Sequence, residues 1–76
     1  MNLYEQCDAV KTKDDLMIFI QVLRNDLQTN NDEWENITLE HYLESIEAWI
    51  TDTTSLPNEP NWKSLAQIMY AGKVYE

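Results

Sequence analysis

The stretch DEWENITLEHYLESIEAWI (residues 32–50) decides the predicted fold, because it combines a helix start with a helical spacing of apolar residues. Thr38 can cap a helix, and Glu40 in the first turn suits the positive end of the helix dipole. Six apolar side chains then recur at helical spacing: Leu39, Tyr42, Leu43, Ile46, Trp49 and Ile50. This spacing predicts an amphipathic helix from Leu39 to Thr51 whose apolar side is buried.

A second amphipathic helix is predicted upstream, from Asp14 to Leu27. Thr12 can cap this helix, and Asp15 three residues later forms a variant of the capping box. The expected buried side carries Leu16, Phe19, Ile20, Leu23 and Leu27. Ile18 and Val22 lie off that stripe, so they either pack under the N-terminal segment or are exposed.

A third helix is predicted from Trp62 to Tyr75, after a loop from Asp52 to Pro60 that is rich in turn-forming residues. Asn61 can cap this helix, and Pro60 discourages a backward extension. The expected buried side carries Trp62, Leu65, Ile68, Met69 and Tyr75. Gly72 falls on the same side, where it would allow a neighbouring helix to approach closely.

These helices predict an all-α fold, a small three-helix bundle in one domain over residues 1–76. A short extra helix is expected within Met1 to Val10, and no strand is expected. At 76 residues the chain is long enough for one domain only.

The composition restricts the class of partner and the compartment. The net charge of −9 disfavours binding to nucleic acid or to an anionic membrane. Cys7 is the single cysteine, so no internal disulfide can form, which is typical of a reducing compartment. The N-terminal residues lack the apolar segment of a signal peptide, and no apolar run is long enough to cross a bilayer. A cytoplasmic location is therefore expected.

Glu40, Glu44 and Glu47 share one side of the Leu39 to Thr51 helix, roughly 120° from the centre of its apolar side. Nine acidic residues and no lysine or arginine lie between Arg24 and Lys63. This side is either a solvated surface or a binding surface for a basic protein. The predicted partner-binding residues are these three glutamates and the nearby Asp32 and Glu33.

Candidates for chemistry are few. Asp32, Glu33 and Glu35 do not match the spacing of a calcium loop, and His41 is the only histidine, so no histidine pair can hold zinc. Cys7 and His41 form the one possible thiol–imidazole pair, and catalysis would require them to meet in a pocket. We therefore expect no enzyme activity, no metal and no cofactor.

The three tryptophans have two possible roles. Trp49 and Trp62 fall on predicted apolar sides, which favours the core over a ligand-stacking set. Trp34 precedes the Leu39 to Thr51 helix, and it is expected to fold back over the core as a plug. Its indole N–H would then need a hydrogen-bond acceptor.

Several spaced motifs resemble the central signature and the final segment of a family of small acidic bacterial proteins of unknown function. They are Trp34-Glu35-Asn36, Thr38-Leu39-Glu40, Tyr42-Leu43-Glu44, Trp49, Asn61-Trp62-Lys63, Ala66 and Tyr75-Glu76. The resemblance covers the chain from about Val10 to Glu76 and implies no established activity.

The function expected from these patterns is a non-enzymatic protein-interaction module that contacts a basic partner, as an inhibitor or immunity-type protein would. The alternative is a structural or accessory subunit that self-associates through Ile18 and Val22 or through exposed aromatic residues.

Overall fold

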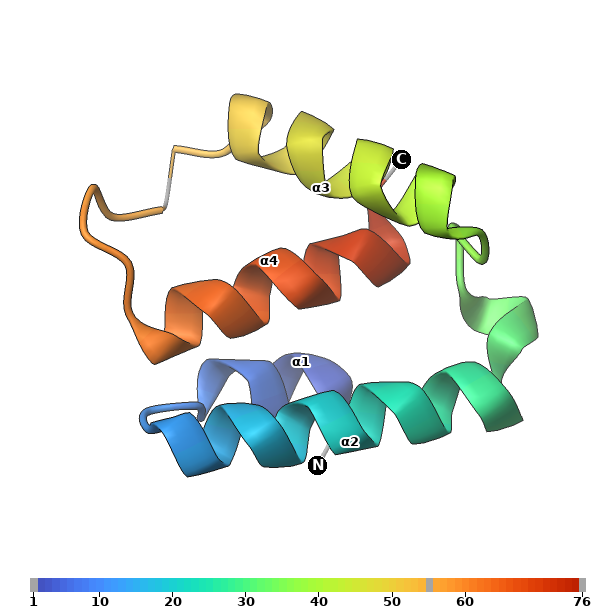
Figure 1. The fold of residues 1–76 in the computed structure, drawn as a ribbon, viewed down its shortest axis with the longest axis horizontal. Helices are drawn as coiled ribbons and strands as arrows, with labels where there is room; N and C mark the ends of the chain where they lie inside the picture. Colours follow the sequence, from blue (N-terminus) through green and yellow to red (C-terminus); the bar gives the residue numbers. More distant parts are fainter. Residues whose placement is uncertain (1, 55, 76) are drawn as a thin grey trace.

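The computed structural model describes residues 2–54 and 56–75, and all regular structure in these ranges is helical. The elements are α1 (Leu3–Asp8), α2 (Lys13–Thr29), the short 3-10 helix η1 (Asn31–Glu33), α3 (Leu39–Asp52) and α4 (Trp62–Val74) (Figure 1). The predicted all-α class and the three main helices are confirmed, with ends that differ by one or two residues. Met1, where the first helix was expected to begin, Ser55 in the loop and the final Glu76 lie outside the described residues.

Each main helix begins where its capping residue predicts. In each one, the cap side chain accepts a hydrogen bond from the backbone N–H three residues later: Thr12, Thr38 and Asn61. Asn61 forms a complete capping box, because the Ser64 hydroxyl accepts a hydrogen bond from the Asn61 backbone N–H at 2.9 Å. These bonds satisfy N–H groups that a helix start leaves without partners.

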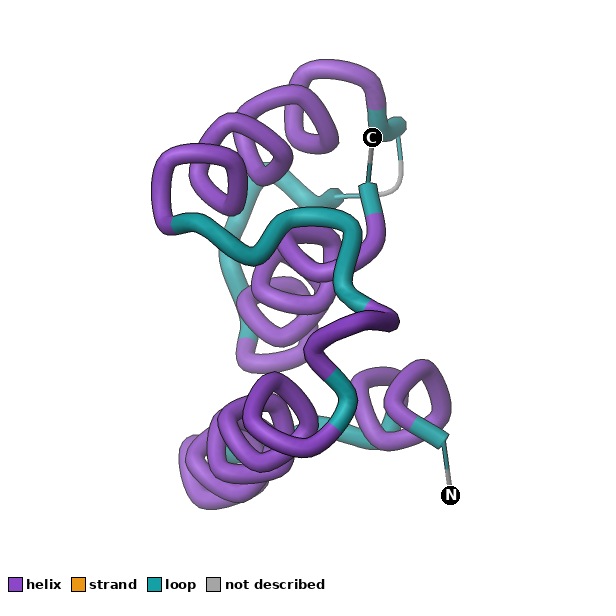
Figure 2. Tube along the Cα trace, turned by 90° about the vertical axis from the view of Figure 1, so that its right-hand side faces the viewer, coloured by secondary structure: helices purple, strands orange, loops and turns teal. Residues whose placement is uncertain are grey.

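α4 is the central helix of the bundle. α3 packs along one side of α4, while α1 and α2 pack on the opposite side and against each other (Figure 1). α2 and α3 do not approach each other. The molecule is therefore flat, with extents of 32 × 26 × 17 Å. Figure 2 shows α3 at the top, α4 in the middle, and α1 and α2 beside each other at the bottom.

The hydrophobic core lies where α1, α2 and α4 meet. Its fully buried members are Cys7, Val10, Phe19, Leu23 and Ala66. Phe19 is the largest of these side chains and is 2% exposed. Burying a side chain of this type stabilises the fold by roughly 1.5–3 kcal/mol, so α2 is held mainly through Phe19 and its neighbours.

α3 approaches α4 closely at Gly72, as predicted. A Cβ atom at Gly72 would lie 2.3 Å from Cε2 of Tyr42, which is closer than any real contact. The Tyr42 hydroxyl donates a hydrogen bond to the Met69 carbonyl at 2.9 Å. The buried Ser45 hydroxyl lies within hydrogen-bond distance of the Ala71 carbonyl. The contact between α3 and α4 therefore includes the polar groups of Tyr42 and Ser45.

Several apolar residues that were expected to be buried are exposed, which corrects the sequence prediction. They are Leu27 on α2, Leu39, Leu43 and Ile50 on α3, and Trp62 and Leu65 on α4. The reason is geometric: α2 and α3 do not meet, so the strip of α4 between them is left uncovered. Ile18 is also exposed, while Val22 is half-buried.

Candidate protein-interaction surface

The predicted acidic residues on α3 form an exposed stripe, defined here as Glu40, Glu44 and Glu47. The spacing of three or four residues places them in a row along the helix. The described ranges, 2–54 and 56–75, contain two ion pairs, and neither involves α3: one joins α1 to α4 and the other joins α2 to α4. The negative charge of the acidic stripe is therefore not neutralised within the molecule.

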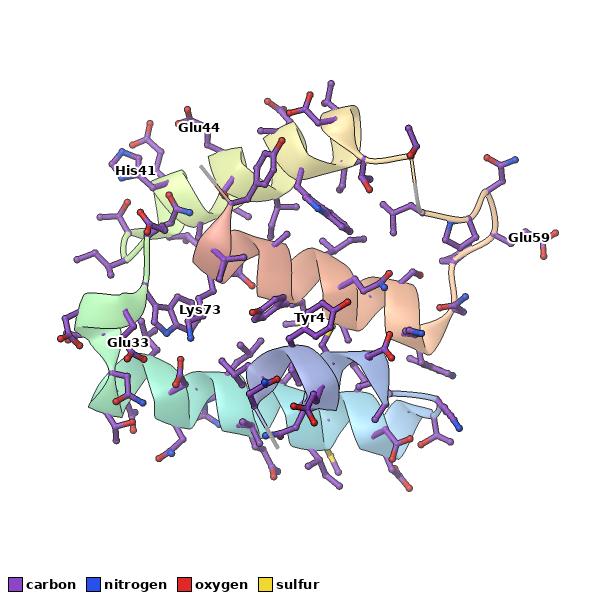
Figure 3. The ribbon with its side chains drawn as sticks, turned by 180° about the vertical axis from the view of Figure 1, so that it is seen from behind. Tyr4, Glu33, His41, Glu44, Glu59 and Lys73 are labelled. Carbon is purple, nitrogen blue, oxygen red and sulfur yellow. The ribbon has the colours of Figure 1, made fainter. Side chains whose placement is uncertain are left out.

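The other two predicted partner-binding residues lie elsewhere. Asp32 and Glu33 are exposed on η1, at the end of α2. Glu33 lines a hollow with Tyr70 and Lys73, and Figure 3 shows it far from Glu44, which projects from the outer side of α3. The structure thus brings together the three glutamates of the acidic stripe but does not bring Asp32 and Glu33 to them.

An exposed apolar strip runs beside the acidic stripe on α3. Its residues Leu39, Leu43 and Ile50 are 72%, 54% and 44% exposed. With 3.6 residues per turn, this strip lies roughly 90° around the helix from the glutamates and roughly 110° from the side that packs on α4. α3 consequently has a packed side, an apolar exposed side and an acidic side, in that order around its axis.

Leu39, at the start of the apolar strip, also lines a groove between α2 and α3. The groove has a volume of about 350 Å³ and is mainly apolar. Its lining includes Ile20 and Leu27 from α2, Met69 from α4, and Ile37 and Leu39 at the start of α3. Ile37 is 63% exposed. The one basic residue among the lining side chains is Arg24 on α2.

Trp34 forms part of the groove wall. Its indole N–H donates a hydrogen bond to Asp26 Oδ2 at 2.8 Å, and its ring stacks on Tyr42 with centroids 6.4 Å apart. The expected plug and its acceptor are therefore present, and the acceptor is Asp26. The Lys73 ammonium lies 5.8 Å from the centre of the Trp34 ring, within range of a cation–π contact.

Asp26 is the centre of this anchoring network. It forms an ion pair with Lys73 at 2.8 Å and also accepts a hydrogen bond from Asn30 at 3.0 Å. Burial acts to raise the pKa of Asp26, but the hydrogen bonds from Lys73, Asn30 and Trp34 favour the charged form, and the pKa of Asp26 is lowered. Asp26 is thus a carboxylate at neutral pH and holds α2, α4 and Trp34 together.

The residues after Trp34 complete the attachment to the end of α4. The Glu35 backbone N–H donates to the Lys73 carbonyl at 3.0 Å. The Asn36 side chain donates to the carbonyls of Gly72 and Tyr75 at 3.2 and 2.9 Å. Carbonyls in the last turn of a helix lack partners within the helix. The Trp34-Glu35-Asn36 motif supplies donors to these carbonyls and so caps the end of α4, although it lies far from α4 in the sequence.

Sequence reasoning missed the roles of Asp26, Asn36 and Lys73. One signal was available: Lys73 lies on the same side of α4 as Ala66 and Met69, and a basic residue on a buried side requires an acidic partner. The sequence could not identify that partner, because several acidic residues on α2 were equally possible.

The thiol and the imidazole are not brought together. Cys7 is buried in the core between α1, α2 and α4, whereas His41 is exposed on α3 (Figure 3). Burial, followed by the nearby Asp8 carboxylate, raises the pKa of the Cys7 thiol to about 11, although Lys63 opposes this shift. Cys7 is therefore a protonated core residue at neutral pH.

Among the residues that the structure describes, no three side chains of the types that ligate metals are grouped closely enough to hold an ion. No helix within residues 2–54 and 56–75 combines the length and the apolar character needed to span a bilayer.

The fold and the surface define a small all-α protein whose exposed features are an acidic stripe and an apolar groove. The chain belongs to a family of unknown function (DUF7660), whose model matches residues 12–76. The match begins at Thr12, the cap of α2, and it includes the whole network around Asp26. No curated protein and no solved structure matched the chain. The resemblance to a family of unknown function is confirmed.

Proposed function

We propose that this protein is a non-enzymatic interaction module that binds a basic protein partner through α3, as an inhibitor or immunity-type protein would. The observation that carries the proposal is the acidic stripe of Glu40, Glu44 and Glu47, which is exposed and has no ion-pair partner among the described residues. The net charge of −9 extends the same sign over the molecule.

Electrostatics supports a basic partner in two ways. Like charges four residues apart on a helix repel by a few tenths of a kcal/mol, and a lysine or arginine from a partner would relieve that repulsion. α3 is also held firmly on α4 by Tyr42 and Ser45, so the carboxylates form a preset row. A preset row of one sign accelerates association with a surface of opposite sign.

The test is charge reversal of the acidic stripe by Glu40→Lys, Glu44→Lys and Glu47→Lys in one variant. These side chains face water, so the fold should be retained, which circular dichroism and a urea melt will check. In a pull-down from the source cell, the variant should lose basic partners that the wild type retains. Raising the salt concentration should weaken wild-type capture, because exposed charges are screened beyond about 10 Å at 0.1 M salt.

The matched control reverses three other exposed acids, Glu5, Glu35 and Glu59, and produces the same change in net charge. This control should keep the partners if the acidic stripe is the binding surface. Equal partners and equal salt sensitivity for the wild type and the stripe variant would show that the acidic stripe is only a solvated surface.

Self-association is a second candidate function, and the exposure of α2 supports it. Met17 and Ile18 are each 53% exposed on α2. An apolar contact between two copies would persist at high salt, since screening reduces the repulsion between two acidic chains. Light scattering after gel filtration, at low and high salt, measures this directly. A monomer under both conditions at high protein concentration would exclude self-association.

A further inference from the structure

One arginine interrupts the apolar side of α2. Ile20, Leu23 and Leu27 recur there at helical spacing, and Arg24 lies in the same row. All four side chains line the groove between α2 and α3. Among the described residues that form this lining, Arg24 is the only charged one. The groove therefore combines apolar walls with a single positive charge.

Arg24 has no acidic partner in the described part of the chain. It is exposed, and the two ion pairs within residues 2–54 and 56–75 belong to Lys63 and Lys73. An arginine on a helix commonly pairs with an acidic residue three or four positions away. None of the four residues at those distances from Arg24 is acidic: Ile20, Gln21, Leu27 and Gln28. Arg24 is therefore available to an anionic group from outside the chain.

The groove is large enough for a small molecule. Its volume of about 350 Å³ lies within the range of roughly 300–1,000 Å³ that is typical of ligand sites. Ile37 and Leu39 in its lining are 63% and 72% exposed, and removing them from water would favour binding of an apolar ligand. In sites of this kind the apolar walls supply affinity, and one or a few polar groups fix the orientation of the ligand.

The charge of the lining selects the head group of the ligand. A guanidinium presents paired N–H donors that match the two oxygens of a carboxylate. A cationic ligand would instead meet Arg24 with the same charge, and no acidic residue in the described lining would compensate. The net charge of −9 repels an anion at long range, but exposed charges more than about 8 Å apart are largely screened at physiological salt.

We infer that the groove between α2 and α3 binds a small apolar carboxylate, with its hydrocarbon part against Ile37 and Leu39 and its carboxylate on Arg24. The site is separate from the acidic stripe, because none of the three stripe glutamates lines the groove. It goes beyond the proposed function, and either one can fail without the other.

The test compares three probes that share one alkyl chain: octanoate, octanol and octylammonium, which are negative, neutral and positive at neutral pH. Each is titrated into the full chain at physiological salt, below the concentration at which it forms micelles. Amide shifts in NMR at Ile37 and Leu39 report binding in the groove and not elsewhere on the acidic surface. Octanoate should bind there more tightly than octylammonium, because only the carboxylate is complementary to Arg24.

Removing the charge of Arg24 should affect only the anionic probe. Arg24→Gln should weaken octanoate about threefold to fivefold, the contribution of an exposed ion pair, and should leave octanol unchanged. The matched control is Lys13→Gln, which removes the same charge from an exposed residue of α2 outside the groove lining. This control should bind octanoate as the wild type does.

The apolar part of the site has its own pair of variants. Ile37→Ser with Leu39→Ser should weaken octanoate and octanol alike, because both probes bury the same alkyl chain. Met17→Ser with Ile18→Ser removes two exposed apolar side chains outside the groove lining and should weaken neither probe. All four residues are exposed, so circular dichroism should show that both variants are folded.

Three results would overturn the inference. The first is equal or tighter binding of octylammonium at the groove amides, and the second is a loss of octanoate affinity in Arg24→Gln that is no larger than in Lys13→Gln. The third is a groove whose amides respond to none of the probes. Shifts of the same amides when the protein is concentrated without a probe would show that a second copy covers the groove, which would also overturn it.

Discussion

Replacing Asp26 with asparagine tests whether the network of Asp26, Lys73 and Trp34 holds the fold together. Asp26→Asn keeps the size of the side chain and one oxygen for the Trp34 indole, but it removes the charge that pairs with Lys73. The side chains of Lys73 and Asp26 are only 11% and 15% exposed, so the lysine would be left as a nearly buried, unpaired cation.

The magnitude follows from that burial. Removing one partner of a buried ion pair typically costs 3–5 kcal/mol. Asp26 and Lys73 keep some contact with water, so we expect a loss of about 3 kcal/mol, the low end of that range. A domain of this length has a free energy of unfolding of roughly 4–11 kcal/mol. Urea unfolding, followed by tryptophan fluorescence and circular dichroism, should therefore show a large drop in midpoint for Asp26→Asn.

Two controls isolate the cause. The ion pair between Lys63 and Asp8 has the same N–O distance, 2.8 Å, but its side chains are 43% and 59% exposed. Asp8→Asn should leave the midpoint nearly unchanged, because exposed ion pairs contribute little. Adding Lys73→Met to Asp26→Asn should restore most of the lost stability, since it removes the unpaired charge. A double variant as unstable as Asp26→Asn alone would refute the reasoning.

The stability difference between the wild type and Asp26→Asn should also depend on pH. The pKa of Asp26 is lowered in the folded state from its ordinary value of 3.8. The stabilisation from a lowered carboxyl pKa is complete above the unfolded pKa and is lost as the pH falls through the folded pKa. The difference should therefore be constant near neutral pH and shrink below the ordinary value. A difference that stays constant down to strongly acidic pH would contradict the assignment of charge to Asp26.

Three further outcomes are expected from the packing. Gly72→Ala should destabilise the fold by about 1–3 kcal/mol, because the new Cβ atom would overlap the Tyr42 ring. In a Tyr42→Leu background that ring is absent, so adding Gly72→Ala should not lower the urea midpoint further. Trp49→Ala removes a half-buried side chain, so it should lower the urea midpoint more than Trp62→Ala does, because Trp62 is 41% exposed. Equal losses for the two variants would contradict this difference in burial. Cys7, with a pKa of about 11, should react with a thiol reagent at pH 8 only in urea, and fast reaction of the folded protein would show that the thiol is accessible.

The positions of the helices could be predicted from the sequence because their signals are local. Thr12, Thr38 and Asn61 each cap a helix through a hydrogen bond to a backbone N–H three residues away. Such bonds, and the helical spacing of apolar residues, depend on neighbours within one or two turns. The acidic stripe on α3 was predictable for the same reason, since its glutamates are three and four residues apart.

Which apolar side of a helix is buried by another helix could not be predicted in the same way. Leu39 and Trp62 belong to apolar stripes as regular as that of Phe19, yet they are exposed while Phe19 is buried. The spacing shows that a helix has an apolar side but does not show whether another helix lies over it. The groove exists because α2 and α3 both pack on α4 and do not meet.

The sequence by itself determined that this protein has three main helices, where each begins, and that one side of α3 carries unrelieved negative charge. Only the tertiary structure decided that Asp26 pairs with Lys73, that Trp34 lines a groove, and that the apolar strip beside the acidic stripe is exposed. The physical reason is the range of the interactions: helix formation and capping depend on neighbouring residues, whereas burial and ion pairing depend on how separate helices pack against α4.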